Sequence, residues 1–474
     1  MNFVSWTFVA LFASVLVARL TIGRCKIEPG YVAALLVSSL VFYAWHVPVY
    51  LGVLLFSSGI DYAAGLWLAR IPLDHHRHRL AVLTLSLGTN LGLLAFFKYA
   101  GFFVQVMSDL FGPDAAGRLS PELALALPMG ISFYTFQSMS YTIDVYRGHL
   151  APVRDYVAFL LFICFFPQLV AGPIVRAVEF LPQMPRPRRL RARVAYEGTW
   201  LIIQGFFLKM VCADNLAVYV DEHWERAAEP GSGSAFALWA ALMFSGQIFA
   251  DFAGYSNIAR GTAYLLGYRL PVNFNAPYIA ASFRNFWERW HITLSRWLRD
   301  YLYVSLGGNR RGRARTYVNL VLVMVLGGLW HGAAYTFIVW GALHGGALAV
   351  ERLLGLHQPD RGWSRSATVR AVWFLVVQSV VLTAWVYFRS GSLEEAELVL
   401  RNIAALDHWA VGTMEVVGLL FLLPLVALHV YTWLRERRLV MPLRPQLRAV
   451  LAACMVYAIV TLYAGTADFI YFQF

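Results

Sequence analysis

The sequence predicts an all-α protein that crosses a membrane many times. Hydrophobic residues make up 59% of the 474 positions and charged residues only 14%, a composition typical of integral membrane proteins. Roughly twenty apolar residues cross a bilayer as a helix. Runs of that kind begin near Asn2, Tyr31, Val49, Leu80, Tyr156, Thr199, Ala235, Thr316, Gly332, Thr368, Val416 and Ala449. We therefore expect about eleven transmembrane helices, in a single membrane-embedded domain over residues 1–474.

The first apolar run is interpreted as an uncleaved helix rather than a signal peptide. No basic segment precedes it, and the cations Arg19, Arg24 and Lys26 follow it. Because cytoplasmic loops carry an excess of cations, these residues place the N-terminus outside. The same rule places three further basic stretches in the cytoplasm: Arg70 to Arg79, Arg186 to Arg193, and Arg435 to Arg438 with Arg444 and Arg448.

Two shorter apolar pieces, Leu127 to Phe136 and Phe165 to Val175, contain glycine and proline and need not span as full helices. Irregular backbone at membrane depth must be buried in protein or line a cavity. These pieces are therefore candidates for re-entrant segments.

Composition and motif searches exclude several function classes. Basic cytoplasmic loops and anionic lipid headgroups account for most of the net charge of +12, so no nucleic-acid partner is expected. The four cysteines are scattered without a close pair, which indicates neither a disulfide framework nor a thiolate metal site. The nucleophile elbow, the phosphate-binding loop, the HExxH zinc motif and the dinucleotide-binding glycine motif are all absent.

The region from Asn273 to Arg315 departs from the bilayer pattern. This region contains eight arginines but only two carboxylates, Glu288 and Asp300. At helical spacing, its aromatic and leucine side chains gather on one side, which predicts an amphipathic helix, and such helices usually lie on a membrane surface. The same face carries His291.

His331 lies inside an uncharged stretch of 35 residues, from Thr316 to Val350. As one helix this stretch would measure about 52 Å, against a hydrocarbon core of about 30 Å, so a break is expected within it. The glycines that flank His331 are the natural place for that break, and they would let a ligand approach the ring. A buried imidazole stays neutral, which is the form that a general base needs. The alternative is a histidine that only bonds a neighbouring carbonyl.

The ten other histidines of the chain have ordinary explanations as loop, interfacial or packing residues. Two of them, His344 and His429, lie in apolar runs, where we expect hydrogen-bonded packing roles.

Several long motifs resemble the membrane-bound O-acyltransferase superfamily, above all its bacterial alginate O-acetyltransferase branch. The two most specific are FRNFWERWHITLSRWLRDYLYVSLGGNRRG and GGLWHGAAYTFIVWGALHG. Further similar stretches occur in the same order along most of the chain: FFKYAGFF, LPMGISFYTFQSMSYTIDVYRG, FFPQLVAGPIVR, FADFAGYSNIARG and the terminal FIYFQF.

The resemblance implies a helical fold around a central tunnel, with a catalytic core at about residues 125–350. It implies that His331 is the essential histidine and His291 the second polar position. Asp251 is an acidic group in an apolar run and a candidate for lining the cavity. The side chains of Trp287, Trp290 and Trp330 could exclude water from the site. Packing or anchoring at the membrane interface explains these tryptophans equally well. Asn309 and Arg310, with Arg311 and Arg313, form a basic patch that would meet an anionic donor or lipid headgroups.

The function predicted is transfer of an acetyl group from a cytoplasmic thioester across the bacterial inner membrane to an exported, alginate-like or cellulose-like polysaccharide. The donor would be acetyl-CoA or an acyl carrier, with no bound cofactor or metal, and a periplasmic acetyltransferase-like or esterase-like partner would complete the transfer. Peptidoglycan O-acetylation is the alternative within the class. A sugar transporter with histidine proton relays is the alternative from another class.

Overall fold

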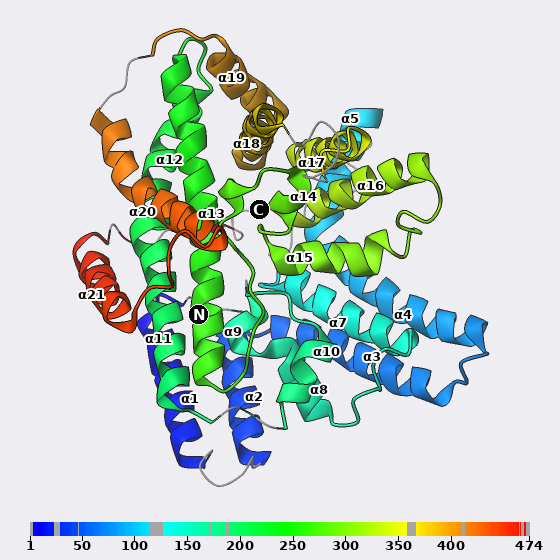
Figure 1. The fold of residues 1–474 in the computed structure, drawn as a ribbon. Helices are drawn as coiled ribbons and strands as arrows, with labels where there is room; N and C mark the ends of the chain where they lie inside the picture. Colours follow the sequence, from blue (N-terminus) through cyan, green and yellow to red (C-terminus); the bar gives the residue numbers. More distant parts are fainter. Residues whose placement is uncertain are drawn as a thin grey trace. The chain divides into compact units, whose positions relative to one another are not determined.

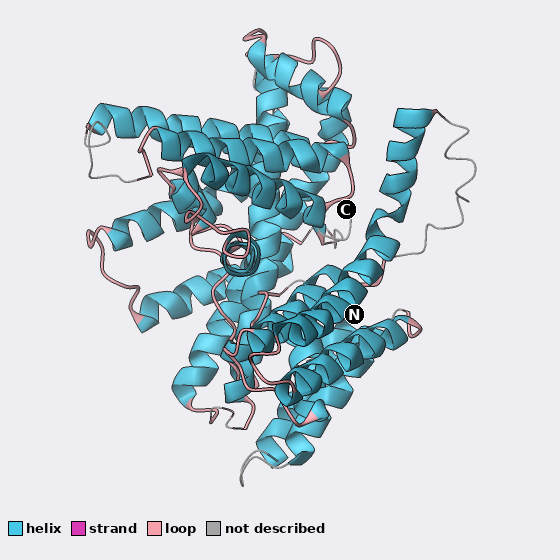
Figure 2. Ribbon diagram, turned by 90° about the vertical axis from the view of Figure 1, so that its right-hand side faces the viewer, coloured by secondary structure: helices cyan, strands magenta, loops and turns pink. Residues whose placement is uncertain are grey.

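The computed structural model describes residues 3–22, 29–45, 47–112, 127–170, 172–185, 187, 189–357, 366–409, 413–463, 465 and 469–470. Throughout these residues the regular elements are helices, and no strand occurs among them (Figure 2). The predicted all-α class is confirmed. By length and composition, six described segments can cross a membrane: Tyr50–Arg70, His76–Phe111, Ala192–Ala227, Ser234–Leu265, Ala367–Arg389 and Val416–Glu436. Three shorter apolar helices accompany them, and the total of about eleven crossings stays a prediction.

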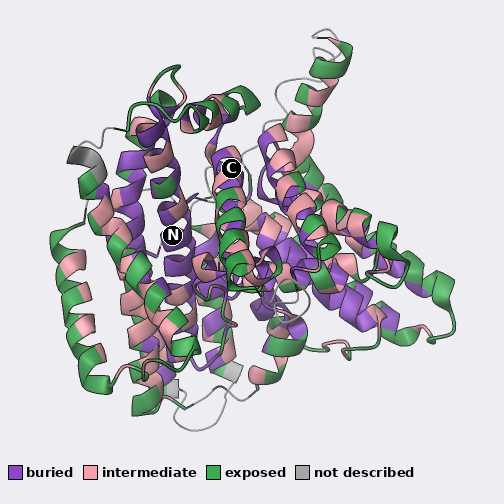
Figure 3. Ribbon diagram, turned by 45° about the horizontal axis from the view of Figure 1, so that its top comes forward, coloured by how far each residue is buried: buried purple, intermediate pink, exposed green. Residues whose placement is uncertain are grey.

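The chain divides into two compact units. Unit 1 comprises residues 1–202 and 258–271, and unit 2 comprises residues 203–257 and 272–474. Many helices carry buried residues along one side and exposed residues along the other (Figure 3). The single domain expected over the whole chain stays a prediction.

Unit 1 is built on a bundle of apolar helices (Figure 1). Its helices are α1 (Trp6–Ile22), α2 (Pro29–Ala44), α3 (Tyr50–Arg70), α4 (His76–Leu94), α5 (Ala100–Phe111), α7 (Ile131–Tyr146), α8 (Tyr156–Cys164), α9 (Phe166–Leu169), α10 (Ala177–Phe180) and the first part of α11 (Ala192–Phe206). Helix α3 packs against both α4 and α7, and α2 packs against α8. A π-helical turn, Ala95–Tyr99, joins α4 to α5.

The two short apolar pieces are irregular and buried inside unit 1. Phe165, Phe166 and Leu169 are fully buried, although α9 is only four residues long. Gly130 precedes α7 with a φ of 72°, and a Cβ there would lie 2.6 Å from the carbonyl oxygen of Leu169. Glycine is therefore needed at this turn, both for its backbone angle and for the close approach of the two pieces.

The cations used to predict the topology are only partly described. Arg19 is 7% exposed and packs against Gly267, so it lies inside unit 1 rather than in a loop. Arg24, Lys26 and Arg186 lie outside the described residues.

Unit 2 contains both predicted histidines. Its helices are the rest of α11, η4 (Phe207–Ala213), α12 (Asp214–Ala227), most of α13 (Ser234–Leu265), η5 (Pro277–Ile279), α14 (Phe283–Trp287), α15 (Ile292–Trp297), η6 (Leu298–Tyr303), α16 (Arg313–His331), α17 (Tyr335–Leu353), α18 (Ala367–Arg389), α19 (Leu393–Ala404), α20 (Thr413–Glu436) and α21 (Pro445–Thr461). Helix α16 ends at His331 and α17 begins at Tyr335. The predicted break at the glycines beside His331 is confirmed.

Glycines let α16 and α17 pack with their backbones in contact. A Cβ on Gly328 would collide with the carbonyl of Phe337, and one on Gly341 would collide with the carbonyl of Met324. A Cβ on Gly345 would lie 2.6 Å from the Cα of Val321. Small residues at such spacing allow close helix packing in membranes. Of the glycines beside His331, Gly328 admits the backbone of α17, and approach of a ligand to the ring stays a prediction.

The predicted amphipathic surface helix is wrong in two respects. The segment is two short helices, α14 and α15, broken at His291, whose φ of 39° is left-handed. Its aromatic residues are also buried within unit 2, with Phe286 fully buried and Trp290 only 1% exposed. Helical spacing could not reveal the break, because tertiary contacts of His291 impose it.

We expect Gly328→Ala to lower the melting temperature of the purified protein in detergent. The added methyl group must push α17 away from α16, and such overpacking costs about 1–3 kcal/mol. Gly346→Ala on α17 is the matched control, because a Cβ there meets no atom within 4 Å and alanine favours the helix. Equal melting temperatures for the two variants would contradict this account of the helix pair.

Candidate active site

His331 is enclosed by aromatic side chains at the end of α16. It is 4% exposed, and its ring centroid lies 4.9 Å from Trp330, 5.1 Å from Trp340 and 5.5 Å from Phe388. These rings come from α16, α17 and α18. The enclosure keeps bulk water away from the imidazole.

The structure brings His291 to His331. Their ring centroids are 6.5 Å apart, although the two residues lie in different helical segments. His291 is fully buried, and its ring packs edge-on against Phe252 at 4.7 Å. Because a hydrogen bond extends about 2.8 Å from a ring nitrogen, one substrate atom could contact both rings.

Asn273 holds His291 in a defined tautomer. Its Oδ1 accepts hydrogen bonds from the backbone N–H and the hydroxyl of Thr293, and lies 3.1 Å from Nδ1 of His291. A backbone N–H can only donate, so Oδ1 is an acceptor and Nδ1 of His291 carries the proton. Nε2 of His291 therefore keeps its lone pair, and it has no hydrogen-bond partner among the described residues. Complete burial lowers the pKa of His291 to about 3, so the ring is neutral.

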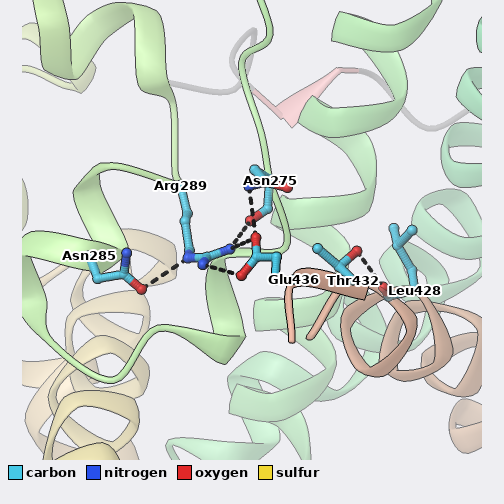
Figure 4. A network of polar contacts seen from close by, with 6 residues as sticks. All are labelled: Asn275, Asn285, Arg289, Leu428, Thr432 and Glu436. Carbon is cyan, nitrogen blue, oxygen red and sulfur yellow. Dashed lines mark hydrogen bonds and ion pairs between the residues drawn. The ribbon is translucent and has the colours of Figure 1, made fainter. Parts of the chain in front are cut away.

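Arg289, two residues before His291, is at the centre of a network of polar contacts (Figure 4). Arg289 donates two hydrogen bonds to Glu436 on α20, at 2.9 and 2.7 Å, and a third to Asn285. It also donates to the carbonyl of Asn275, whose N–H donates back to the carbonyl of Arg289. Such a two-pronged pair fixes geometry as well as charge.

The three predicted tryptophans lie in this aromatic cluster. Trp330 lies 6.2 Å from His291 by ring centroid, while Trp290 packs against Trp385 at 4.7 Å. Trp287 contacts Trp340 at 5.8 Å. All three are less than a tenth exposed, so they are packing residues around the histidines rather than interface anchors.

His344 differs from its expected role. It is fully buried, and neither ring nitrogen has a hydrogen-bond partner within the described parts of the chain. Its ring contacts Trp340 at 4.8 Å and Trp287 at 5.0 Å. His429, in contrast, is hydrogen-bonded to the carbonyl of Leu425, as expected.

A cavity of about 630 Å³ within unit 2 has Trp287 in its lining. Its lining includes Asn309 and a set of cations that the sequence did not single out: Arg284, Arg296, Arg299 and Arg352. Met324 of α16 also lines it and precedes His331 by seven residues, or about 10 Å of helix. Trp287, which lines this cavity, contacts Trp340, and Trp340 contacts His331.

The predicted basic patch divides at Asn309. Only Asn309 lines the cavity, whereas Arg310, Arg311 and Arg313 are exposed and are not among its lining residues. Arg284, Arg296 and Arg299 lie on the polar side of the broken amphipathic segment. Arg352 lies at the end of α17, outside the motifs.

Asp251 belongs to a buried ion network. Lys209, on the π-helical turn η4, lies 2.9 Å from Asp251 and 2.8 Å from Asp214. The second oxygen of Asp251 accepts a hydrogen bond from the backbone N–H of Ile470. The bond to Asp251 holds Ile470 against α13. Asp251 is next in sequence to Phe252, whose ring contacts His291. Lys209 was not predicted, since a single lysine in an apolar run has no motif.

No group of three or more histidine, cysteine or acidic side chains suited to a metal ion occurs among the described residues. The predicted absence of a metal remains a prediction.

Comparison with known proteins identifies the family. The model of MBOAT, the membrane-bound O-acyltransferase family, matches residues 147–392. The chain is 39% identical over 385 residues to a protein named probable alginate O-acetylase AlgI of Azotobacter vinelandii, covering 80% of this chain and 74% of the relative. It is 36% identical to the peptidoglycan O-acetyltransferase of Helicobacter pylori, covering 79% and 73%.

A more distant relative is the teichoic acid D-alanyltransferase of Bacillus subtilis, which is 30% identical and covers 46% of this chain and 56% of the relative. The family model covers just over half of the chain, and relatives above 30% identity cover most of it. The chain therefore belongs to the membrane-bound O-acyltransferase family and is a multi-pass membrane O-acyltransferase.

Proposed function

We propose that this enzyme transfers an acetyl group from a cytoplasmic thioester to an exported polysaccharide in the bacterial inner membrane, with His331 as general base. The observation that carries the proposal is the buried pair of His331 and His291, enclosed by aromatic rings. Contacts of Trp340 and Trp287 link His331 to a cavity lined by arginines. Similarity to alginate O-acetylases favours an alginate-like or cellulose-like acceptor. Peptidoglycan is the second candidate because of the Helicobacter pylori relative.

The chemistry needs a base because a hydroxyl group is a weak nucleophile. His331 takes the hydroxyl proton as the oxygen attacks the thioester carbonyl, and positioned base catalysis contributes roughly 10² to 10⁴ in rate. The new C–O bond forms, the C–S bond breaks, and the leaving sulfur receives the proton. An aromatic enclosure around the pair favours transfer to the acceptor over hydrolysis by water.

His291 acts as a hydrogen-bond acceptor in this scheme. A second histidine beside the base could orient His331, donate to the carbonyl oxygen, or bind a substrate. Because Asn273 occupies Nδ1–H, the remaining Nε2 has no proton to donate in the neutral ring. His291 therefore accepts a hydrogen bond, from the acceptor hydroxyl or from His331.

The donor enters from the arginine-lined cavity. Arginine pairs with phosphate groups through parallel hydrogen bonds, and both CoA and a phosphopantetheine carrier present phosphate next to a long flexible thiol arm. That arm would pass Trp287 to place the thioester beside His331.

A periplasmic partner that completes the transfer, and a cytoplasmic acyl carrier, are the proteins expected to associate with the enzyme. The family assignment argues against the sugar-transporter alternative, because an O-acyltransferase moves an acyl group.

His331→Ala is expected to abolish acetylation without stopping polymer synthesis. The test measures acetyl ester content of extracellular polysaccharide and of peptidoglycan in a deletion strain complemented with wild type or variant, at matched membrane levels. Loss of acetyl groups from one polymer identifies the acceptor. His429→Ala is the matched control, a buried histidine whose Nδ1 only bonds its own helix. Unchanged acetylation of both polymers in His331→Ala would refute the proposed mechanism.

Removing the arginines that line the cavity should raise KM for the donor more than it lowers kcat. We expect the double change Arg296→Ala and Arg352→Ala to raise KM for acetyl-CoA at least about tenfold, because hydrogen bonds to charged groups contribute about 1.5–3 kcal/mol each, with kcat little changed. The measurement is transfer from labelled acetyl-CoA by the purified protein. Arg310→Ala with Arg313→Ala, outside the cavity, should leave KM as in wild type. An equal rise in both double variants would mean that the cavity does not select the donor.

Changing Asn273 tests the assigned tautomer. Asn273→Ala should lower kcat by about a hundredfold and leave KM little changed, since a small misplacement of a catalytic group reduces the rate by about that factor. Asn273→Asp keeps the acceptor oxygen and should retain more activity, with the acidic limb of the pH profile moved upward because a carboxylate favours the charged imidazole. If both variants lose activity in proportion to a lowered melting temperature, Asn273 serves the fold alone.

A further inference from the structure

A surface pocket lies in unit 1 at the turn that joins α3 to α4, apart from every residue used in the proposed reaction. Both helices belong to segments that are long and apolar enough to cross a membrane, and they pack against each other (Figure 1). The pocket has a volume of about 480 Å³, which is ample for part of a ligand. Its lining residues are Trp67, Arg70, Ile71, Pro72, His75, His78, Ala81, Val82 and Leu85.

The pocket is basic near the turn. Arg70 is an exposed residue in the last turn of α3, while His75 and His78 lie at the start of α4. The ring centroids of the two histidines are 5.8 Å apart, so one phosphate group could accept hydrogen bonds from both rings. None of the lining residues is acidic, and α4 has no acidic residue in its first turn. A guanidinium group beside imidazole donors suits a phosphate ligand.

Away from the turn the pocket is apolar. Its lining continues along α4 to Leu85, which lies about 10 Å of helix beyond His78. On α3, Trp67 lies one turn before Arg70. Trp67 is 55% exposed and Leu85 is 59% exposed, although both are large and apolar. A small soluble anion would leave this apolar surface uncovered, whereas a hydrocarbon chain would cover it.

A buried arginine holds the turn in place. Arg79 is 5% exposed and donates hydrogen bonds to the carbonyls of Leu68 and Ile71, at the end of α3. It also donates to the carbonyl of Tyr146, at the end of α7. The basic side chains of the pocket therefore project from a turn that is already fixed, so a ligand would bind with little loss of backbone freedom.

We propose that this pocket binds one anionic phospholipid of the surrounding membrane. The phosphate pairs with Arg70, His75 and His78, and an acyl chain lies along the apolar surface of Trp67 and Leu85. The turn is predicted to face the cytoplasm, and cations next to a membrane span attract anionic headgroups there. A zwitterionic lipid would bring its own cation to this basic group and gain less. The proposal does not rest on the proposed function.

The test measures lipid binding to the purified full-length protein in detergent by native mass spectrometry. Phosphatidylglycerol and phosphatidylcholine with identical acyl chains are titrated separately, and the dissociation constant of the first bound lipid is determined for each. We expect wild type to bind phosphatidylglycerol at least about tenfold more tightly, because its net charge is not offset by a cation in the headgroup. Equal binding of the two lipids overturns the proposal.

A pair of double variants separates the pocket from the general charge of the turn. Arg70→Gln with His78→Gln should weaken phosphatidylglycerol binding at least about tenfold. His76→Gln with Arg77→Gln is the matched control, because these exposed residues have the same chemistry and lie in the same turn but outside the lining. It should bind the lipid as wild type does. Equal weakening in both double variants contradicts the proposed pocket.

The chain-binding part is tested with the headgroup alone. Soluble glycerophosphoglycerol, which lacks acyl chains, should not displace phosphatidylglycerol at equal concentration. Trp67→Ala should raise the dissociation constant of the lipid several-fold, because apolar contact area is lost. If the soluble headgroup competes as well as the lipid and Trp67→Ala binds normally, the pocket holds a free phosphate compound and the proposal fails.

Discussion

The hydrogen bonds of one amide, that of Asn273, set the geometry of the buried pair His291 and His331. Asn273 binds His291, at the break between α14 and α15, and Thr293, in the first turn of α15, and its NH₂ group donates to Ser256 on α13. These bonds favour a left-handed backbone at His291, a conformation that is otherwise costly for a residue with a Cβ. The break turns the ring inward, toward His331.

The strain at His291 is offset by its neighbours rather than by the residue itself. Arg289 ties the preceding turn to α20 through a forked pair with Glu436, and Trp290 is packed among aromatic rings. On the far side of the site, Gly328 and Gly341 hold α16 and α17 together. Both histidines thus sit on backbone that is held from several directions, which is the preorganisation that positioned catalysis requires.

The sequence could predict those parts of the molecule that follow from local patterns. The helical class, the break beside His331 and the two candidate histidines followed from apolar runs, glycine spacing and family motifs. It could not predict the left-handed His291, because helical periodicity continues through that position and only the distant Asn273 contradicts it. The cavity arginines and the Lys209 network were missed for the same reason, since each depends on contacts between helices far apart in the chain.

The end of α16 at His331 has an electrostatic consequence. A helix C-terminus carries a partial negative charge of roughly half a unit, which stabilises cations in its last turn. A ring that has just taken a proton there is favoured, while a departing sulfur anion at the same place is repelled. In the proposed reaction, the terminus would therefore assist proton removal from the hydroxyl and favour prompt return of that proton to the leaving sulfur.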